Sequence, residues 1–595
     1  MTEDHPGSAR ARVAALSGLA AYAPGLAVLR SYERGWLSKD LVAGLVLTAL
    51  LVPQGMAYAE LAGLPAVTGL YTSVLCLVGY AAFGPSRVLV LGPDSSLGPM
   101  IAATILPLIA ADGDPARAVA LASILSLLVG AFMVLAGIAK FGFVADLLST
   151  PTQIGYMNGL ALTIVVGQLP KLFGFSVDAD GLIPETVGFV EGVAAGETVT
   201  AALAIGAAGL AVILVLQRWL PKVPAVLVAV VLSIAAAAVS GAGDRGVDLV
   251  GVLPQGFPPF TVPQVYLSDL PLLVVGALGI AIVALTDTIS TASAFAARTG
   301  QEVRPNQEMI GIGAANVSAG LFQGFPVSTS GSRTAVAEQA GSKSQLTGLV
   351  GAAAITAMLV FLPGLLRNLP QPTLAAVVIA AALSLADIRG TVRLWRQRRA
   401  EFTISLVAFL GVALLGVLPG IAVAVVLSIL NVFRRTWRPY QTRLGRVDGL
   451  AGYHDVTLHT EAEQLDGLVL YRFDAPLIFA NARTFREQIR AIADAEQRPR
   501  WIVVAAEPMT DVDTTAADVL EDLDADLAAA GVRLVFAELK DPVRAKLERY
   551  DLAGALGPDR FFPTVEAAVE AYRAEHPSSW RVFGAPPPTP EQPGR

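Results

Sequence analysis

Fourteen apolar segments fill most of the chain between residues 40 and 434, and they constrain its fold more than any other feature. They lie at 40–60, 66–83, 90–110, 117–138, 144–169, 198–217, 223–241, 270–295, 308–323, 330–341, 346–364, 371–386, 402–418 and 420–434. An α-helix needs about 20 apolar residues to cross a bilayer, and several of these segments are shorter. Only 15% of the residues are charged, against roughly 25% in soluble proteins. We therefore predict a polytopic α-helical membrane protein.

The basic residues of the connecting loops predict how the segments are oriented. Fourteen crossings place both termini on one side of the membrane. The loops on that side hold Arg87, Lys140, Arg218, Lys222, Arg298, Arg304, Lys343, Arg389, Arg393, Arg396, Arg398 and Arg399, and the opposite loops hold only Arg117, Lys171, Arg245 and Arg367. Basic residues concentrate in cytoplasmic loops. We expect a multi-pass protein of the plasma membrane with cytoplasmic termini, and the polar start of the chain lacks a signal-peptide pattern.

The C-terminal part of the chain differs in character. Residues 441–595 hold 26 acids and 17 bases, a net charge of −9. From residue 453, short apolar runs alternate with helical patterns, which indicates an α/β layer structure. We predict a cytoplasmic N-terminal arm at 1–38, a transmembrane domain at 39–436, a linker at 437–452, an α/β domain at 453–576 and a disordered tail at 577–595.

Two of the short apolar segments share a pattern that interrupts a helix. The third contains VLGPDSSLGPM and the tenth contains GFPVSTSGSRTAV, and in each a serine-rich turn precedes an apolar half-helix. Paired interruptions of this kind indicate the binding site of an inverted-repeat transporter. A helix that begins at the bilayer midplane directs free N–H groups and its positive dipole end into the cavity. The pattern predicts an anion site between two facing helix ends.

The same segments carry a resemblance to a known family. LVPQGMAYAELAGLPAVTGLYTS, followed by FGPSR and LGPDSS, resembles the signature region of the SulP family of sulfate permease-like anion transporters. NQEMIGIGAANVSAGLFQGFPVSTSGSRTAV resembles the matching region of the second repeat. The resemblance implies two inverted repeats of seven spans, arranged as a core domain and a gate domain. The anion would lie between the facing ends of spans three and ten.

The resemblance and the serine-rich turns together give a set of anion-site residues. These are Gln54, Tyr58, Gly92, Pro93, Asp94, Ser95, Ser96, Ser330, Ser332 and Arg333. In bicarbonate-carrying relatives, an acid on span eight and a threonine four residues later bind sodium, and Asp287 and Thr291 match that pair. Residues four apart share one face of a helix, and hard cations prefer oxygen ligands. The alternative is that Asp287 pairs with Arg333 or is protonated within the bundle.

Arg333 and Asp94 each have more than one interpretation. Arg333 contacts the anion with its planar fork, or it neutralises Asp287 and leaves anion binding to the helix ends. Asp94 stands where the family often has a small, polar or aromatic residue. It is a proton carrier, a second cation ligand, or a helix cap that accepts N–H bonds at the start of span three.

The α/β tail carries a second resemblance. DVDTTAADVLEDL resembles the switch region of STAS domains, which are the usual C-terminal partners in this family. In related bacterial regulators the residue that matches Thr515 is phosphorylated, and a helix N-terminus favours a phosphate. The alternative is an ordinary cap at Asp513 inside a dimerising or regulatory domain. We expect a homodimer.

The function that follows is secondary active transport of an inorganic oxyanion, sulfate or bicarbonate foremost, coupled to Na⁺ or H⁺ through Asp287. A passive channel or exchanger, or a membrane-tethered anion sensor that signals through the STAS domain, are the alternatives. No nucleophile and base pair, metal cluster or phosphate-cradling loop stands out, so we expect a transporter rather than an enzyme. We expect no organic cofactor, no nucleic-acid partner, and contact with membrane lipid.

Overall fold

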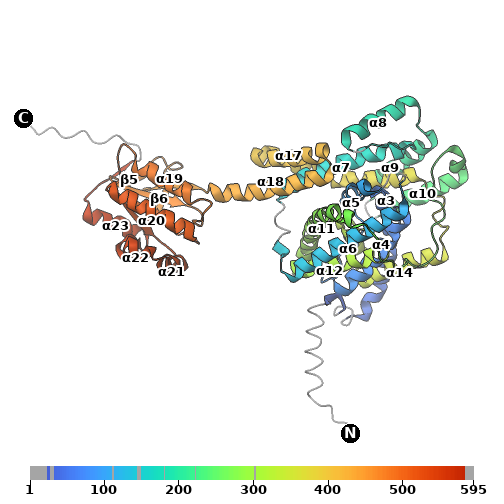
Figure 1. The fold of residues 1–595 in the computed structure, drawn as a ribbon, viewed down its shortest axis with the longest axis horizontal. Helices are drawn as coiled ribbons and strands as arrows, with labels where there is room; N and C mark the ends of the chain where they lie inside the picture. The colour runs from blue at the N-terminus through green and yellow to red at the C-terminus, as the bar shows by residue number, and fades with distance from the viewer. Residues whose placement is uncertain are drawn as a thin grey trace, which may run out of the picture. The chain divides into compact units, whose positions relative to one another are not determined.

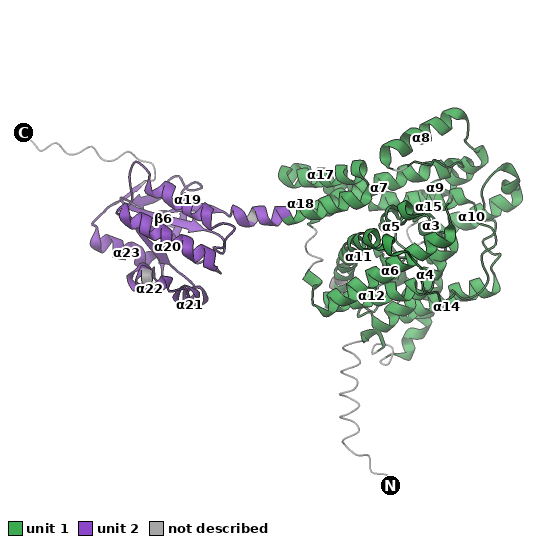
Figure 2. Ribbon diagram, viewed as in Figure 1, with its two compact units in different colours: residues 1–429 green, residues 430–595 purple. Residues whose placement is uncertain are grey.

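A computed structural model describes residues 23–26, 32–109, 113–143, 149–179, 181–220, 223–299 and 303–582. The chain forms two compact units, residues 1–429 and 430–595 (Figure 2). The first unit is helical, and the second is an α/β unit (Figure 1). The described parts of the chain therefore have the predicted fold class.

Each of the fourteen apolar segments contains a helix in the described structure. The first seven are α3 (Leu37–Leu61), α4 (Ala66–Phe83), α5 (Gly98–Ile105), α6 (Pro115–Ile138), α7 (Thr150–Phe173), α9 (Thr200–Trp219) and α10 (Ala225–Ser240). The second seven are α11 (Leu270–Thr299), α12 (Pro305–Gly320), α13 (Gly331–Gln339), α14 (Leu346–Phe361), α15 (Gln371–Leu385), α17 (Arg399–Leu415) and α18 (Val417–Trp437). Among the described residues, seven helical stretches are long and apolar enough to cross a membrane, and three apolar helices are shorter. Two further helices, α8 (Leu182–Ala195) and α16 (Ile388–Gln397), lie outside the predicted segments.

The third and tenth segments are discontinuous. In each, an extended pair of residues precedes the half-helix: β1 (Leu91–Gly92) before α5, and β2 (Ser328–Thr329) before α13. The two strands pair in antiparallel register, Leu91 with Thr329 and Gly92 with Ser328. The pairing satisfies backbone groups that would otherwise lack partners at membrane depth. It also brings the beginnings of α5 and α13 together.

The helices of the first unit pack in two groups. In what we term the core group, α3, α4, α5 and α6 pack with α11, α12, α13 and α14. In the gate group, α7, α9 and α10 pack with α15, and α17 packs on α7 and precedes α18. The two groups meet chiefly where α3 passes α15 and α10. This division follows the two domains that the family resemblance implies.

Glycine allows the closest helix approaches inside the core group. A Cβ atom on Gly69 of α4 would lie 1.8 Å from the carbonyl oxygen of Gly55 on α3. A Cβ atom on Gly130 of α6 would lie 2.7 Å from the carbonyl oxygen of Gly313 on α12. In a bilayer the hydrophobic effect does not drive helices together. Small residues at such crossings allow the close backbone packing that does.

The second unit is built on one mixed sheet. Its strands are β3 (Gln441–Arg446), β4 (Tyr453–Asp455), β5 (Glu463–Leu465), β6 (Leu468–Phe473), β7 (Trp501–Ala505), β8 (Arg533–Ala537), β9 (Phe561–Phe562) and β10 (Trp580–Val582), in the order β10-β5-β3-β6-β7-β8-β9 with β4 beside β3. The strands from β6 to β9 run parallel. The helices are α19 (Ala482–Ala493), α20 (Thr514–Ala529), α21 (Asp541–Arg549), α22 (Leu552–Leu556) and α23 (Val565–Glu575).

The sheet has a separate apolar core on each face. One core holds side chains of α19, α20, α21 and α22, and the other holds those of α23. The stretch predicted as a linker, residues 437–452, contributes β3 to the sheet, where it pairs with β6 although its sequence QTRLGR holds a single large apolar residue, Leu444. The stretch predicted as a disordered tail begins with β10, and residues 583–595 lie outside the described part of the chain.

Candidate functional site

The paired strands hold two polar turns against each other at the centre of the first unit. On the α13 side, Ser330 is the N-cap, and its hydroxyl oxygen accepts a hydrogen bond from the Arg333 backbone N–H at 3.5 Å. On the α5 side, the backbone N–H groups of Leu97 and Gly98 donate to the carbonyl oxygen of Asp94 at 3.3 and 3.2 Å. The two turns are cross-linked, because the Ser330 N–H donates to the Val90 carbonyl oxygen at 3.2 Å. Both helix N-termini are thus held at one place.

A cavity of about 620 Å³ lies beside these turns. Nine of the residues predicted for the anion and cation sites line it: Gln54, Tyr58, Asp94, Ser95, Asp287, Thr291, Ser330, Ser332 and Arg333. Three others, Gly92, Pro93 and Ser96, are buried behind the lining. The structure therefore gathers the predicted residues from α3, α11 and both turns around one space.

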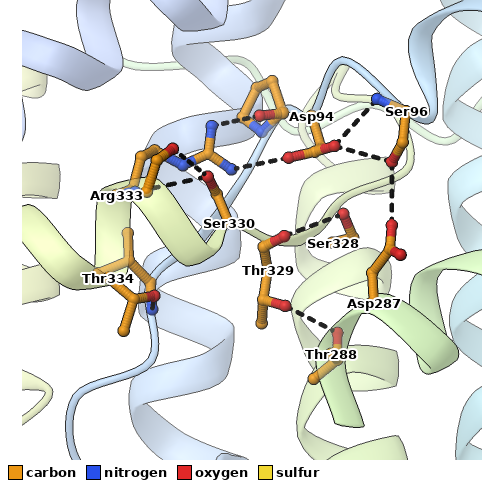
Figure 3. A network of polar contacts seen from close by, with 12 residues as sticks. Asp94, Ser96, Asp287, Thr288, Ser328, Thr329, Ser330, Arg333 and Thr334 are labelled. Atoms are coloured by element: carbon orange, nitrogen blue, oxygen red, sulfur yellow. Dashed lines mark hydrogen bonds and ion pairs between the residues drawn. The ribbon is translucent and has the colours of Figure 1, made fainter. Parts of the chain in front are cut away.

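The Arg333 guanidinium is buried within the wall of the cavity, at 1% exposure. Its Nη1 donates to the carbonyl oxygen of Pro93, and its Nη2 lies 3.8 Å from Oδ2 of Asp94 (Figure 3). The buried Nε and Nη2 atoms have no hydrogen-bond partner within the described protein. The acidic partner of Arg333 is thus Asp94 rather than Asp287, and the positive charge of Arg333 lies between the two turns.

Asp94, Ser96 and Asp287 form a chain of polar contacts (Figure 3). The Ser96 Oγ lies 2.8 Å from Oδ1 of Asp94 and 3.1 Å from Oδ2 of Asp287. The Ser96 backbone N–H also donates to Oδ1 of Asp94 at 3.0 Å. That last bond lies in the turn before α5, whose N-cap is Leu97 and has no side-chain cap hydrogen bond, so Asp94 does not cap this helix. The two acids are therefore linked through a single hydroxyl.

Thr291 and Asp287 both line the cavity from α11. The first turn of α13 approaches this position, since a Cβ atom on Gly331 would lie 3.9 Å from Oγ1 of Thr291. A carboxylate and a hydroxyl face one space here, and both are ligand types that a hard cation prefers.

Sequence reasoning missed the lining that the gate group supplies. Gln153 and Met157 of α7, Gln217 of α9 and Ser384 of α15 line the cavity opposite the turns. The signal available was the presence of two amides in otherwise apolar segments, which is weak because amides are common near helix ends. The gate side of the cavity thus carries three uncharged polar side chains among apolar ones such as Val226, Val377 and Leu385.

The cavity opens toward one membrane face. We call the membrane face at which α3 begins and α18 ends the terminal face. Because successive crossings alternate in direction, α7 and α10 begin at this face, and α9 and α15 end there. The cavity lining includes a residue near each of these four helix ends: Gln153 of α7, Ala225 of α10, Gln217 of α9 and Leu385 of α15. At the opposite face, the Lys171 Nζ of α7 donates to the Glu60 carbonyl oxygen of α3 at 3.5 Å. The lining therefore extends to the terminal face, and a contact between α3 and α7 lies at the opposite face.

In the second unit, Thr515 lies exposed in the first turn of α20. The Asp513 carboxylate caps this helix by accepting a hydrogen bond from the Ala516 N–H at 2.8 Å. The cap is the contact expected of an ordinary helix start, and Thr515 is placed where a modifying enzyme could reach it.

Three comparisons bear on the identity of this chain. A probable sulfate transporter of Mycobacterium tuberculosis is 42% identical over 93% of this chain and 98% of its own length. The structure of the murine Solute Carrier 26 family member A9 anion transporter in the inward-facing state has a TM-score of 0.86 at 24% identity, covering 96% of both chains. The transmembrane domain of the cyanobacterial bicarbonate transporter BicA has a TM-score of 0.58 at 22% identity, covering 66% of this chain and 98% of that one. The two structural likenesses concern the fold alone.

Family models match both units. The model of the sulfate permease family matches residues 37–408, and the STAS domain model matches residues 459–568. The first match spans more than half of the chain. The chain is a member of the sulfate permease family, with a STAS domain at its C-terminal end.

Proposed function

We propose that this protein is a secondary active transporter of a small inorganic oxyanion, with sulfate as the first candidate and bicarbonate as the second. The family and the named relatives are transporters, so the chain is a multi-pass membrane transporter and not an enzyme. One observation carries the finer proposal: the β1–β2 pair holds two helix beginnings beside a 620 Å³ cavity that also contains Asp287. Sulfate comes first because the relatives that match most of the chain are named sulfate transporters.

The anion would be held by partial charges rather than by a direct ion pair. The starts of α5 and α13 supply backbone N–H groups and positive dipole ends. Ser95, Ser330 and Ser332 add hydroxyl donors from the cavity wall. The buried charge of Arg333 offsets that of Asp94, so the acid beside the turns does not repel the anion.

A coupled cation completes the charge balance. The cavity lining includes two acids, Asp94 and Asp287, and one base, Arg333. An anion entering such a site is favoured when a positive charge accompanies it, because uncompensated charge at membrane depth is costly. Asp287 is the acid without the arginine partner, and we assign the coupling ion to it.

The contacts of Ser96 favour a proton as that ion. A hydroxyl carries one hydrogen, but the Ser96 Oγ lies within hydrogen-bond distance of both carboxylates. The arrangement is satisfied when Ser96 donates to Asp94, which already accepts a backbone N–H, and a protonated Asp287 donates to Ser96. Sodium held by Asp287 and Thr291 is the competing assignment, and the donor types fit it.

Movement of the core group against the gate group would expose the site to each side in turn. The terminal face would be the cytoplasmic face of the plasma membrane, as the excess of basic residues in its loops favours. Two chains would associate as a homodimer, with the STAS domain as a dimerising or regulatory part.

Uptake into proteoliposomes tests the proposal. Labelled sulfate and labelled bicarbonate are supplied separately, with an inward proton gradient, an inward sodium gradient or neither. We expect sulfate to accumulate with the proton gradient, and the Asp287→Asn variant to lose accumulation while it still unfolds at the wild-type temperature. Uptake that ignores both gradients and survives in the variant would indicate a passive channel or exchanger. No oxyanion flux under any condition would favour an anion sensor.

A further inference from the structure

Helix α16 is fixed to the gate group at the mouth of the cavity. It begins three residues after Leu385, which lines the cavity at the end of α15. Asn158 of α7 holds its start: the Asn158 Oδ1 accepts from the Asp387 N–H at 2.7 Å, and the Asn158 Nδ2 donates to the Thr391 Oγ1 at 2.9 Å. Asn158 adjoins Met157, another lining residue. A force on α16 therefore reaches two elements that form the gate side of the cavity.

The inner face of α16 is buried and its outer face carries two parallel stripes. Gly390 and Leu394 pack inward. Ile388, Val392 and Trp395 form an apolar stripe with exposures of 64%, 43% and 54%. Arg389, Arg393 and Arg396 repeat the same spacing one residue later, and all three are exposed. Residues at this spacing share one side of a helix, so an apolar edge and a cationic edge run side by side.

The cationic stripe has no acidic partner among the described residues. Arg398 pairs with Glu401 at 3.1 Å, and the Arg399 guanidinium lies 5.7 Å from the centre of the Trp395 ring. No ion pair joins Arg389, Arg393 or Arg396 to an acid in the described part of the chain. Three guanidinium groups are thus presented together at the terminal face, where α15 ends and α17 begins.

We infer that α16 is a docking surface for the headgroups of anionic phospholipids in the leaflet at the terminal face. Charge complementarity favours an anionic partner, and the apolar stripe decides its kind. A helix with an apolar edge beside arginines lies in the membrane interface, where side chains such as Trp395 enter the headgroup region. An acidic protein surface would pair with the arginines but would leave three large apolar side chains in water.

Docked lipid would hold the gate group at the bilayer surface while the core group moves. This consequence rests on the proposed transport function, whereas the docking itself does not. Each basic residue near an anionic surface contributes about a fivefold gain in affinity, so removing three charges should weaken docking by about 100-fold.

The test uses the full-length protein and two readouts. The first is the phosphatidylglycerol that stays bound when the protein is purified in detergent from mixed phosphatidylcholine–phosphatidylglycerol vesicles, measured by mass spectrometry. The second is sulfate uptake in phosphatidylcholine vesicles against the mixed vesicles. The variants are the triple Arg389→Gln, Arg393→Gln, Arg396→Gln, and the same three positions changed to Lys. The charge-matched control is the triple Arg483→Gln, Arg498→Gln, Arg573→Gln, on exposed residues of the second unit.

We expect wild type, the Lys triple and the control to retain phosphatidylglycerol and to transport faster in mixed vesicles, and the Gln triple at α16 to lose both properties. If the Gln triple at α16 retains as much phosphatidylglycerol as wild type, the docking proposal is wrong. An acidic protein that co-purifies with wild type but not with the Gln triple at α16, while phosphatidylglycerol retention is equal, would also overturn the docking. Equal wild-type uptake in both vesicle types would overturn the effect on the gate group. Absence of sulfate uptake in every lipid would contradict the proposed function, and lipid retention would still decide the docking.

Discussion

At the scale of single residues, Arg333 connects the two turns of the candidate site through its contacts with Pro93 and Asp94. Arg333 is buried, donates to the Pro93 carbonyl oxygen and lies near the Asp94 carboxylate. It therefore joins the α13 turn to the α5 turn from inside the wall. Its effect on the proposed anion would be electrostatic, while the serine hydroxyls of the two turns line the cavity beside it.

Replacing Arg333 by Gln should destabilise the protein and weaken anion binding. The change leaves the Asp94 carboxylate, which is 14% exposed in the cavity wall, without its cationic partner, and the Pro93 carbonyl without its charged donor. Breaking a largely buried pair in this way costs about 3 kcal/mol. The unfolding temperature, followed by tryptophan fluorescence, and sulfate affinity measured by calorimetry check both effects.

The double variant Arg333→Gln, Asp94→Asn is the control for that change, because it removes both charges. It should recover much of the lost stability. If Arg333→Gln unfolds at the wild-type temperature and binds sulfate normally, the role assigned to this pair is wrong.

The candidate residues could be predicted from the sequence, but their partners could not. Asp287 and Arg333 were found because charges are rare within apolar segments, and the serines because they follow glycine and proline in matching turns. Arg333 and Pro93 are separated by 240 positions, so their contact depends on how the two repeats fold together. The gate-side residues such as Gln217 carried too little signal to be selected.

At the scale of elements, close backbone contact decides where helices of the core group cross. Gly69 of α4 leaves no room for a side chain against the carbonyl oxygen of Gly55. Gly209 of α9 differs, since a Cβ atom there would first meet the Ala376 Cβ at 4.0 Å. The two glycines therefore offer a matched comparison on buried faces of two helices.

Gly69→Ala should destabilise the protein by about 3 kcal/mol, because the added methyl must displace backbone. Gly209→Ala should be neutral or stabilising by up to about 1 kcal/mol, as alanine favours a helix. Thermal unfolding of both variants in the same detergent measures the difference. Equal unfolding temperatures would show that α3 and α4 are not packed as closely as the structure has them.

The elements themselves were largely predictable. All fourteen apolar segments contain helices in the described structure, and the two half-helices lie at the glycine and proline interruptions. The additional helices α8 and α16 were missed because both mix polar and exposed residues with apolar ones, so neither resembles a span. Strand β3 was missed for a related reason, since short half-exposed strands lack a continuous apolar run.

At the scale of the whole membrane domain, the proposed transport cycle requires the core and gate groups to move against each other. The contact between Lys171 of α7 and Glu60 of α3 joins the groups at the face opposite the terminal one. Opening that face must separate these two residues, whereas contacts within one group should persist.

A reversible cross-link tests this movement. Glu60→Cys with Lys171→Cys, joined by a bifunctional thiol reagent, should stop sulfate uptake, and reduction should restore it. The native Cys76 is fully buried and does not compete. The control joins Phe83→Cys to Gln307→Cys within the core group, where the Gln307 Nε2 lies 3.5 Å from the Phe83 carbonyl oxygen. Undiminished uptake by the first cross-linked pair would exclude movement between the groups at this face.

The central claim is that one site binds the anion between the helix beginnings and a proton at Asp287. Calorimetry of sulfate binding in buffers of different ionisation enthalpy tests it most directly, because it counts the protons taken up with the anion. In sodium-free solution, as the pH is raised until the Asp287 carboxyl ionises in the anion-free protein, binding should take up about one proton per sulfate. The Asp287→Asn variant should take up none, and added sodium should leave the wild-type affinity unchanged. Sulfate binding to wild type with no linked proton, or with the same linkage in the variant, would contradict the account.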